Sequence, residues 1–245
     1  SSSETKDFKQ NVLIEDVTGA WCQHCPRVSY RLEQLKKQTS QLVVVAAHYG
    51  DALQYSKVSE LSNLFGLKGY PWAQLNRTQR WNEQSGSVTA LVDNKAKAGV
   101  ALESTLSEKT LTLKFKSKFA EDFSDLKYVV FLLEDDIKLD QSQWAGGDYG
   151  YGRGTDRDGD GRMWLINFNH TDVLRHAFTS GPLGDAIPLS STKKGSTFEK
   201  SFTYEVPTSF NKEKLKLVGI VVKKDNKVIN VRLSEIGKTQ AFEEL

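Results

Sequence analysis

The chain has 245 residues, of which 33 are basic and 31 are acidic, so its formal net charge is only +2. Charges of both signs are spread along the sequence, which excludes a surface built for nucleic acid. No apolar run reaches the roughly 18 to 20 residues that a membrane-spanning helix needs. The length exceeds that of a common single domain and predicts two domains. Residues 1–10 begin with three serines and are expected to form a flexible N-terminal tether.

Residues 11–103 show the element order of an α/β domain. Residues 11–17 form a compact apolar run that predicts a buried strand. Residues 23–38 place apolar side chains three and four positions apart, which predicts an amphipathic helix. Residues 41–48 predict a second buried strand, parallel to the first. We expect further helices over residues 51–65 and 86–102, with a hairpin over residues 73–81 between them.

The second half of the chain, residues 104–245, changes to alternating apolar and polar side chains. Five segments show this pattern: 110–115, 128–133, 198–206, 215–222 and 228–233. Such a series of short strands predicts an all-β, immunoglobulin-like sandwich domain. A long Gly/Asp-rich loop interrupts it at residues 140–162, and loops of that length are commonly functional or disordered.

Cys22 and Cys25 are the two cysteines of the chain, and they lie where the first strand passes into the first helix. A helix N-terminus stabilises a thiolate, so Cys22, expected to be exposed, would attack a disulfide. Cys25, expected one turn inside the helix, would resolve the mixed disulfide. His24 adds partial positive charge, which favours the thiolate and the oxidising direction. A static disulfide and half of a zinc site are the alternatives.

The strand before the cysteines ends in Glu15 and Asp16, and Trp21 directly precedes Cys22. In this segment the chain resembles the thioredoxin superfamily, in which a strand with a buried acid leads into Trp-Cys-x-x-Cys at the start of a helix. The resemblance implies that Asp16, six residues before Cys22, handles the proton of the resolving cysteine. Glu15 competes for that role, and Trp21 shields one flank of the pair.

Gly69-Tyr70-Pro71 follows later in the chain and resembles the cis-proline loop of the same superfamily. The resemblance implies that Pro71 packs against the disulfide and that Tyr70 and Trp72 contact an extended substrate. The implied substrates are protein thiols or disulfides, with a redox partner protein.

Three further segments extend the pattern over nearly the whole chain: residues 12–19 (VLIEDVTG), residues 128–135 (YVVFLLED), and Asn169-His170 followed by residues 173–175 (VLR). In these segments the chain resembles the outer-membrane lipoprotein family related to the twenty-eight-kilodalton surface protein. That family joins a thioredoxin-like domain to a β-sandwich. The resemblance implies a location in the envelope of a Gram-negative bacterium, periplasmic or as an outer-membrane lipoprotein, with membrane contact only through an N-terminal lipid anchor.

Residues 156–162 place acids at positions one, three and five of a turn, with glycine at position six. Calcium loops present oxygens in this order, and the ligands here would be Asp156, Asp158, Asp160 and the carbonyl of Arg162. Position twelve is Asn167 where a calcium loop has a bidentate glutamate. A calcium site and a solvated acidic turn both remain open, and no other cofactor is required.

Two further groups of residues lie outside these motifs. The aromatic residues Trp144, Tyr149 and Tyr151 lie among glycines, and they either form an adhesive loop for a partner or fold back onto the domain. His170 and Arg175 are expected to form a hydrogen-bonded structural pair between strands.

Two functions are therefore predicted. The first is an extracytoplasmic thiol–disulfide oxidoreductase that works in the oxidising or isomerising direction. The second is a surface-anchored binding or scaffold lipoprotein, in which the β-sandwich engages a partner and the thioredoxin-like domain is structural. Exposure of the Cys22 sulfur beside a groove flanked by Pro71 distinguishes them, because a capped dithiol favours the second function.

Overall fold

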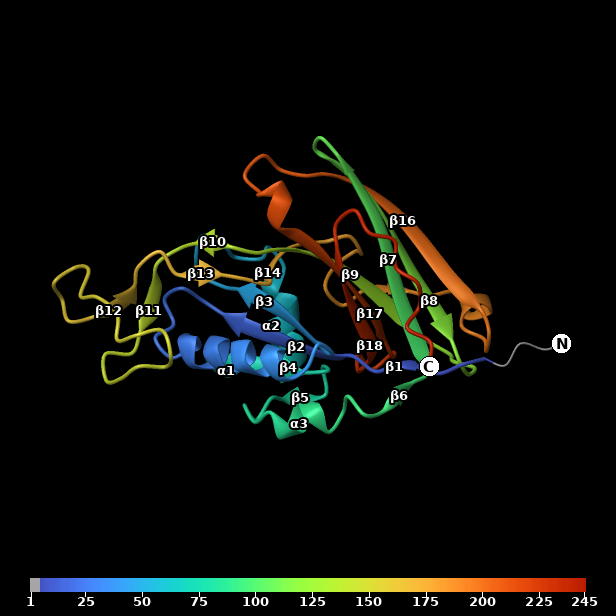
Figure 1. The fold of residues 1–245 in the computed structure, drawn as a ribbon, viewed down its shortest axis with the longest axis horizontal. Helices are drawn as coiled ribbons and strands as arrows, with labels where there is room; N and C mark the ends of the chain where they lie inside the picture. Colours follow the sequence, from blue (N-terminus) through green and yellow to red (C-terminus); the bar gives the residue numbers. More distant parts are fainter. Residues whose placement is uncertain (1–4) are drawn as a thin grey trace.

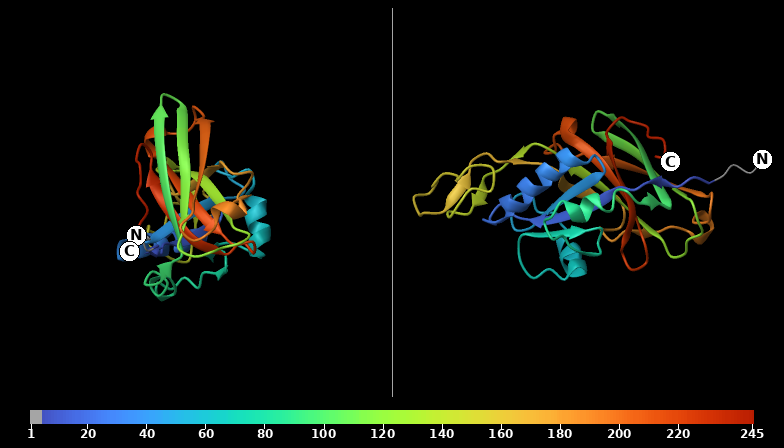
Figure 2. Two further views of the ribbon diagram at one scale, coloured as in Figure 1. Left: turned by 90° about the vertical axis from the view of Figure 1, so that its right-hand side faces the viewer. Right: turned by 60° about the horizontal axis from the view of Figure 1, so that its bottom comes forward.

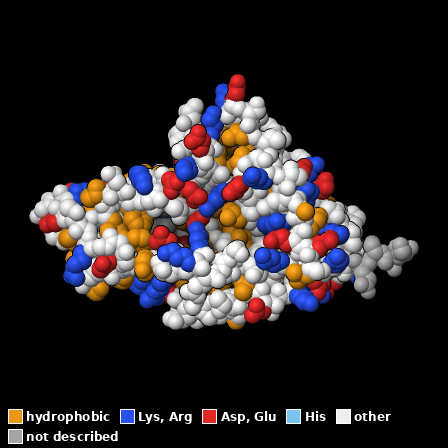
Figure 3. Space-filling view, in the orientation of Figure 1, with side chains coloured by type: hydrophobic (Ala, Val, Ile, Leu, Met, Phe, Trp, Pro, Cys, Tyr) orange, Lys and Arg blue, Asp and Glu red, His pale blue; other side chains and the backbone are white. Residues whose placement is uncertain are grey.

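The computed structural model describes residues 5–245, and in this part the chain is mostly β-sheet with few helices (Figure 1). The helices are α1 (Cys25–Gln38), α2 (Val58–Phe65) and α3 (Gly86–Thr89), with two 3-10 turns at Leu189–Ser191 and Lys212–Lys214. None of the helices in the described part is long and apolar enough to cross a membrane. Basic and acidic side chains are interspersed over the face drawn in Figure 3, as the near-zero net charge predicts.

One large mixed sheet of nine strands runs through the molecule. Its order is β18 (Val228–Glu235), β17 (Leu215–Val222), β9 (Lys127–Glu134), β14 (Val173–Ala177), β3 (Leu42–His48), β2 (Val12–Thr18), β4 (Trp72–Leu75) and β5 (Gln79–Arg80), with β15 (Asp185–Ala186) paired to β9. A second sheet contains β16 (Thr197–Glu205), β8 (Thr110–Phe119) and β7 (Ala98–Ser107). Three small two-stranded sheets pair β1 (Phe8–Lys9) with β6 (Lys95–Ala96), β10 (Ile137–Lys138) with β13 (Asn169–His170), and β11 (Gln141–Gln143) with β12 (Met163–Leu165).

The predicted parallel pair, β2 and β3, lies inside the large sheet and is buried on both faces. Successive residues of a strand point to opposite faces. Leu13 and Val17 therefore pack with α2, whereas Val12 and Ile14 pack with α1. Apolar side chains on both faces explain why these strands read as unbroken apolar runs in the sequence.

The three-stranded sheet covers the other end of the large sheet. Figure 2 shows β7, β8 and β16 standing against β17 and β18. On β9, Val130 and Leu132 point into the core between the two sheets, while Phe131 and Leu133 point to the α2 side. The five strands predicted in the second half are confirmed as β8, β9, β16, β17 and β18.

The two halves of the chain both contribute strands to the large sheet. Val173 of β14 pairs in parallel with Ala46 of β3 and in antiparallel with Glu134 of β9. Without β14, both β3 and β9 would present an unpaired edge, which is unfavourable for buried strands. The sandwich and the α/β part are therefore joined through hydrogen bonds.

Two further expectations need correction. The predicted helix over residues 86–102 is wrong, because α3 ends at Thr89 and β7 begins at Ala98. The apolar pattern there has two parts: Val88 packs under α1, and Ala98 and Val100 alternate as a strand. The expected tether is also shorter, because Phe8 is completely buried in β1; residues 1–4 lie outside the described residues.

The predicted long loop belongs to a larger segment that we call the insertion, residues 135–172, between β9 and β14. It contains β10, β11, β12 and β13, and its β11–β12 pair lies at one end of the molecule, beyond the start of α1 (Figure 1). The insertion therefore reaches the segment that carries the cysteines.

Candidate functional site

The two cysteines lie in the turn between β2 and α1. Cys25 is the first residue of α1, and Pro26 occupies the first turn, where its missing N–H costs nothing. Cys22 and Cys25 form a disulfide with a Cα–Cα distance of 5.3 Å. Cys22 is only 4% exposed and Cys25 only 1%. The expectation of an exposed Cys22 is therefore wrong, and Cys25 lies at the helix start and not one turn inside.

Strand β11 of the insertion covers the disulfide turn, which is the physical reason for this burial. Four hydrogen bonds attach it: Ser142 N to Ala20 O at 2.7 Å, Trp144 N to Gln23 O at 3.0 Å, and Gln141 Nε2 to Cys22 O at 3.0 Å and to Gly19 O at 3.1 Å. The Gln141 side chain is itself buried. The disulfide turn is thus covered by β11, which we call the cap and which lies more than a hundred residues away in the sequence.

The aromatic residues of the insertion fold back onto α1, which decides between the two alternatives for them. The hydroxyl of Tyr149 lies 2.6 Å from Nδ1 of His24, and Trp144 stacks on Tyr149 at a ring distance of 5.7 Å. Tyr151 contacts Tyr30 edge-on and donates a hydrogen bond to Glu33. His24 is therefore held in place by the insertion.

Trp21 and Tyr70 line the same cleft as Cys22. The Trp21 indole donates a hydrogen bond to Tyr49 O at 2.8 Å, and its ring meets Tyr70 edge-on at 4.9 Å. The Tyr70-Pro71 bond is cis, as the motif predicts. A cleft of about 500 Å³ is lined by Cys22, His24 and Tyr70 together with cap residues.

Trp72 does not line that cleft. It pairs with Val17 across the sheet and packs on the α2 side, where Arg80 lies over its ring at 4.4 Å. Strand alternation explains the difference, because Trp72 is the first residue of β4 and points away from α1.

Asp16 is 3% exposed and lies on the α1 face of β2, the same face as Ile14. Its Oδ1 is a buried oxygen without a hydrogen-bond partner. Burial raises the pKa of Asp16 to about 7, with further increases from the negative charges of Glu83 and Asp172. Asp16 is therefore an acid able to exchange a proton near neutral pH.

Glu15 does not compete with Asp16, because it points to the opposite face of β2. It forms a two-pronged ion pair with Arg77 at 2.8 and 2.9 Å, and both side chains are completely buried. Arg77 also donates to Pro182 O at 2.8 Å. Glu15 is therefore a structural residue that ties three segments of the chain together.

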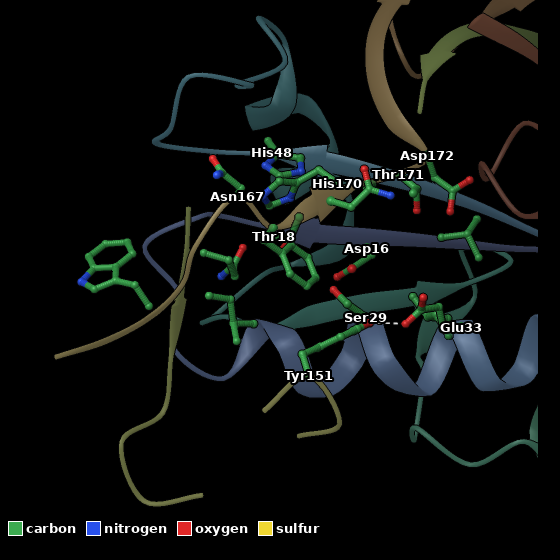
Figure 4. A pocket seen from close by; sticks show the side chains of 18 of the residues that line it. Asp16, Thr18, Ser29, Glu33, His48, Tyr151, Asn167, His170, Thr171 and Asp172 are labelled. Carbon is green, nitrogen blue, oxygen red and sulfur yellow. Dashed lines mark hydrogen bonds between the residues drawn. The ribbon is translucent and has the colours of Figure 1, made fainter. Parts of the chain in front are cut away.

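A cavity of about 660 Å³ lies between α1, the ends of β2 and β3, and the insertion. Figure 4 shows Asp16 pointing into it toward Ser29 and Tyr151, with His48 and His170 on the far side. Sequence reasoning did not assign His48 and Asp172 to a site. The available signal was the alternation of β2 and β3, which puts Asp16, Thr18 and His48 on one face at the strand ends.

The expected hydrogen-bonded pair of His170 and Arg175 is wrong, because each side chain contacts a different group. His170 Nε2 lies 3.0 Å from Leu139 O, and burial lowers the pKa of His170 to about 4. Arg175 lies 3.3 Å from Glu134.

The predicted calcium ligands are engaged by other groups. Asp156 accepts hydrogen bonds from Asp160 N at 3.1 Å and Gly161 N at 3.3 Å. Asp158 pairs with Arg157 at 3.0 Å and Asp160 with Arg162 at 2.8 Å. Within residues 5–245, no group of three or more His, Cys, Asp or Glu side chains is arranged to hold a metal ion.

Taken together, a large sheet shared by both halves and a capped disulfide define a β-rich protein with a small helical part. The model of the family described as outer membrane protein Omp28 matches residues 58–240, which is most of the chain. The chain therefore belongs to this family, and the family places it in the cell envelope, at the outer membrane.

A solved structure with a similar fold is HBP35 of Porphyromonas gingivalis. It matches with a TM-score of 0.70 and 18% sequence identity, over 96% of this chain and 78% of that chain. At this identity the similarity shows the fold alone. No curated protein matches the chain significantly in sequence.

Proposed function

We propose that the chain is a surface-anchored binding or scaffold lipoprotein of the outer membrane, whose thioredoxin-like unit, residues 11–103, has a structural role. The order β2, α1, β3 and β4, the disulfide at the start of α1 and the cis Tyr70-Pro71 bond support a thioredoxin-like unit. Membership of the outer-membrane family supports the location.

The observation that carries this proposal is the cap over the disulfide. Disulfide exchange requires a thiolate to reach one sulfur directly. Here both cysteines are at least 96% buried, and β11 is bonded to the backbone on either side of Cys22. β11 restricts the approach of a protein thiol to the cleft beside Cys22, so we infer that the disulfide serves mainly to fix the turn against which the insertion packs.

The arrangement of the termini supports a surface role. Strand β1 and the C-terminal residues lie together, because Phe8 pairs with Glu244. The β11–β12 end of the insertion lies at the opposite end of the molecule (Figure 1). A lipid anchor attached before β1, which the family resemblance implies, would leave the insertion pointing away from the membrane.

Capture of partner proteins tests this function. A Cys25→Ser variant leaves Cys22 unable to complete exchange, so an active oxidoreductase accumulates as a mixed disulfide with its substrates. We expect Cys25→Ser expressed in the envelope to hold no more disulfide-linked protein than the Cys22→Ser/Cys25→Ser control. Specific accumulation of linked proteins contradicts the structural role.

Thiol–disulfide exchange is the second candidate function, and Asp16 is the observation that favours it. A buried acid with a pKa of about 7 on the α1 face suits proton transfer to a resolving thiol. In this function β11 moves aside and a substrate thiolate attacks Cys22 of the disulfide, which releases Cys25 as a thiolate that takes up a proton. A second substrate thiol then resolves the mixed disulfide, so that the substrate leaves oxidised and both cysteines are reduced. The same capture experiment supports it if linked proteins accumulate and disappear in the double variant.

A further inference from the structure

The cavity beside α1 is separate from the cleft at the cysteines. Gln141 of β11 lines the cavity, whereas the next two residues of β11 line the cleft. The cavity opens at the carboxyl ends of the parallel strands β2 and β3, and such strand ends are common places for ligands in open sheets. Its volume of about 660 Å³ suits a small molecule.

Unsatisfied polar atoms point to a ligand. Asp16 lines the cavity and is only 3% exposed, and its Oδ1 has no hydrogen-bond partner. The indole Nε1 of Trp164, also in the lining, is buried and without an acceptor. Buried polar atoms are nearly always hydrogen-bonded in folded proteins. The cavity thus offers one free acceptor, Oδ1 of Asp16.

The charges of the lining favour a cation. Lys36 of the lining is paired with Asp172, which also binds Lys216 from outside the cavity. Two acids of the lining, Asp16 and Glu33, have no basic partner, and Glu33 lies at the mouth with the Tyr151 hydroxyl as its donor.

We propose that this cavity binds a hydroxyl-bearing organic amine of the size of an amino sugar. The ammonium group donates to Asp16, and the ligand hydroxyls meet polar side chains of the lining such as Ser29 and Asn167. Glu33 adds a second negative charge at the mouth, and Tyr151 and Phe168 contribute aromatic surface for the carbon skeleton. Neither cysteine lines this cavity.

Calorimetric titration with glucosamine and galactosamine tests the proposal, with glucose and galactose as uncharged counterparts. We expect saturable binding of at least one amine, and binding of its neutral counterpart weaker by about tenfold or more. Asp16→Asn should weaken amine binding by about tenfold or more, because it removes the charged acceptor. Asp93→Asn, an exposed acid outside the cavity, is the matched control and should bind as the wild type does.

Two additional measurements keep the test decisive. Glu33→Gln, at the exposed mouth, should weaken binding less than Asp16→Asn does and should fold regardless. The indole N–H resonance that disappears in Trp164→Phe should shift when the amine is added. Absence of binding of both amines up to about 10 mM overturns the proposal, as does equal affinity for the neutral sugars or unchanged affinity in Asp16→Asn.

Discussion

Two neighbouring carboxylates on β2, Glu15 and Asp16, point to opposite faces of the large sheet and have different surroundings. Glu15, on the α2 face, is completely buried and fully paired with Arg77. Asp16, on the α1 face, is nearly as buried but has a free oxygen and a pKa raised to about 7. The two side chains are similarly buried, but Glu15 forms a structural ion pair, whereas Asp16 faces a cavity. The hydrogen-bond partners of each carboxylate, more than its burial, distinguish the structural Glu15 from the functional candidate Asp16.

Breaking the Glu15–Arg77 pair should have the largest effect. Arg77→Met leaves the Glu15 charge unpaired in the core, so the free energy of unfolding should fall by about 3–5 kcal/mol. Urea denaturation measures the loss. Arg31→Met, which removes a half-exposed partner of Glu83, is the control and should change stability by less than about 1 kcal/mol. Equal losses in the two variants would remove the contrast between the faces.

Asp16→Asn should instead increase the free energy of unfolding, and only at higher pH. The pKa of Asp16 is about 7 in the folded chain, against 3.8 without the fold, and burial together with Glu83 and Asp172 causes the increase. As the pH rises, Asp16 therefore keeps its proton to a higher pH in the folded state than in the unfolded state. Wild-type stability should be unaffected by Asp16 below about pH 4 and should decline between about pH 4 and pH 7.

The variant lacks this decline, so it should exceed the wild type by up to about 4 kcal/mol at pH 8 and by little at pH 4. Unfolding free energies of both proteins at the two pH values check this. A variant that is less stable than the wild type at pH 8 would show that Asp16 has a charged partner in the folded state.

Weakening the cap should have a moderate effect on stability and a visible effect on the disulfide. Gln141→Ala removes the two hydrogen bonds from its side chain to Gly19 O and Cys22 O, at a cost of about 1–3 kcal/mol. The rate of disulfide reduction by dithiothreitol should rise. Gln10→Ala is the matched control, because its side chain also donates two hydrogen bonds to backbone oxygens, those of Asn11 and Ile229, outside the insertion. Equal reduction rates in both variants would mean that β11 does not limit access.

Calcium should have the smallest effect. Asp158 and Asp160 are paired with Arg157 and Arg162, so a calcium ion must displace both arginines before it binds. We expect the melting temperature to be the same with calcium and with a chelator. A rise with calcium that is lost in Asp156→Asn would establish the loop as a calcium site.

Much of the architecture was predictable because local patterns reflect local packing. The apolar runs of β2, β3 and β9, the amphipathic α1 and the alternating β8 all have the predicted type. The helix expected over residues 86–102 failed because Val88 and Val100 belong to different cores, and one sequence window combined them. The shared sheet was not predictable, since β14 pairs with strands more than 35 residues away on one side and 125 on the other.

The site was predictable only in part, for a similar reason. The offset between Asp16 and Cys22 and the cis Tyr70-Pro71 bond follow from local motifs. The cap does not, because Gln141 meets Cys22 through a contact 119 residues apart in the sequence. An exposed Cys22 was the natural expectation for a helix start, and only tertiary structure shows that another segment covers it.

The equilibrium between the disulfide and glutathione tests the structural role of the disulfide most directly. A capped structural disulfide should have a reduction potential below about −300 mV, so that the glutathione pool does not reduce it. A value between about −230 and −120 mV, the range of glutaredoxins and disulfide-introducing proteins, would contradict the structural role and support exchange.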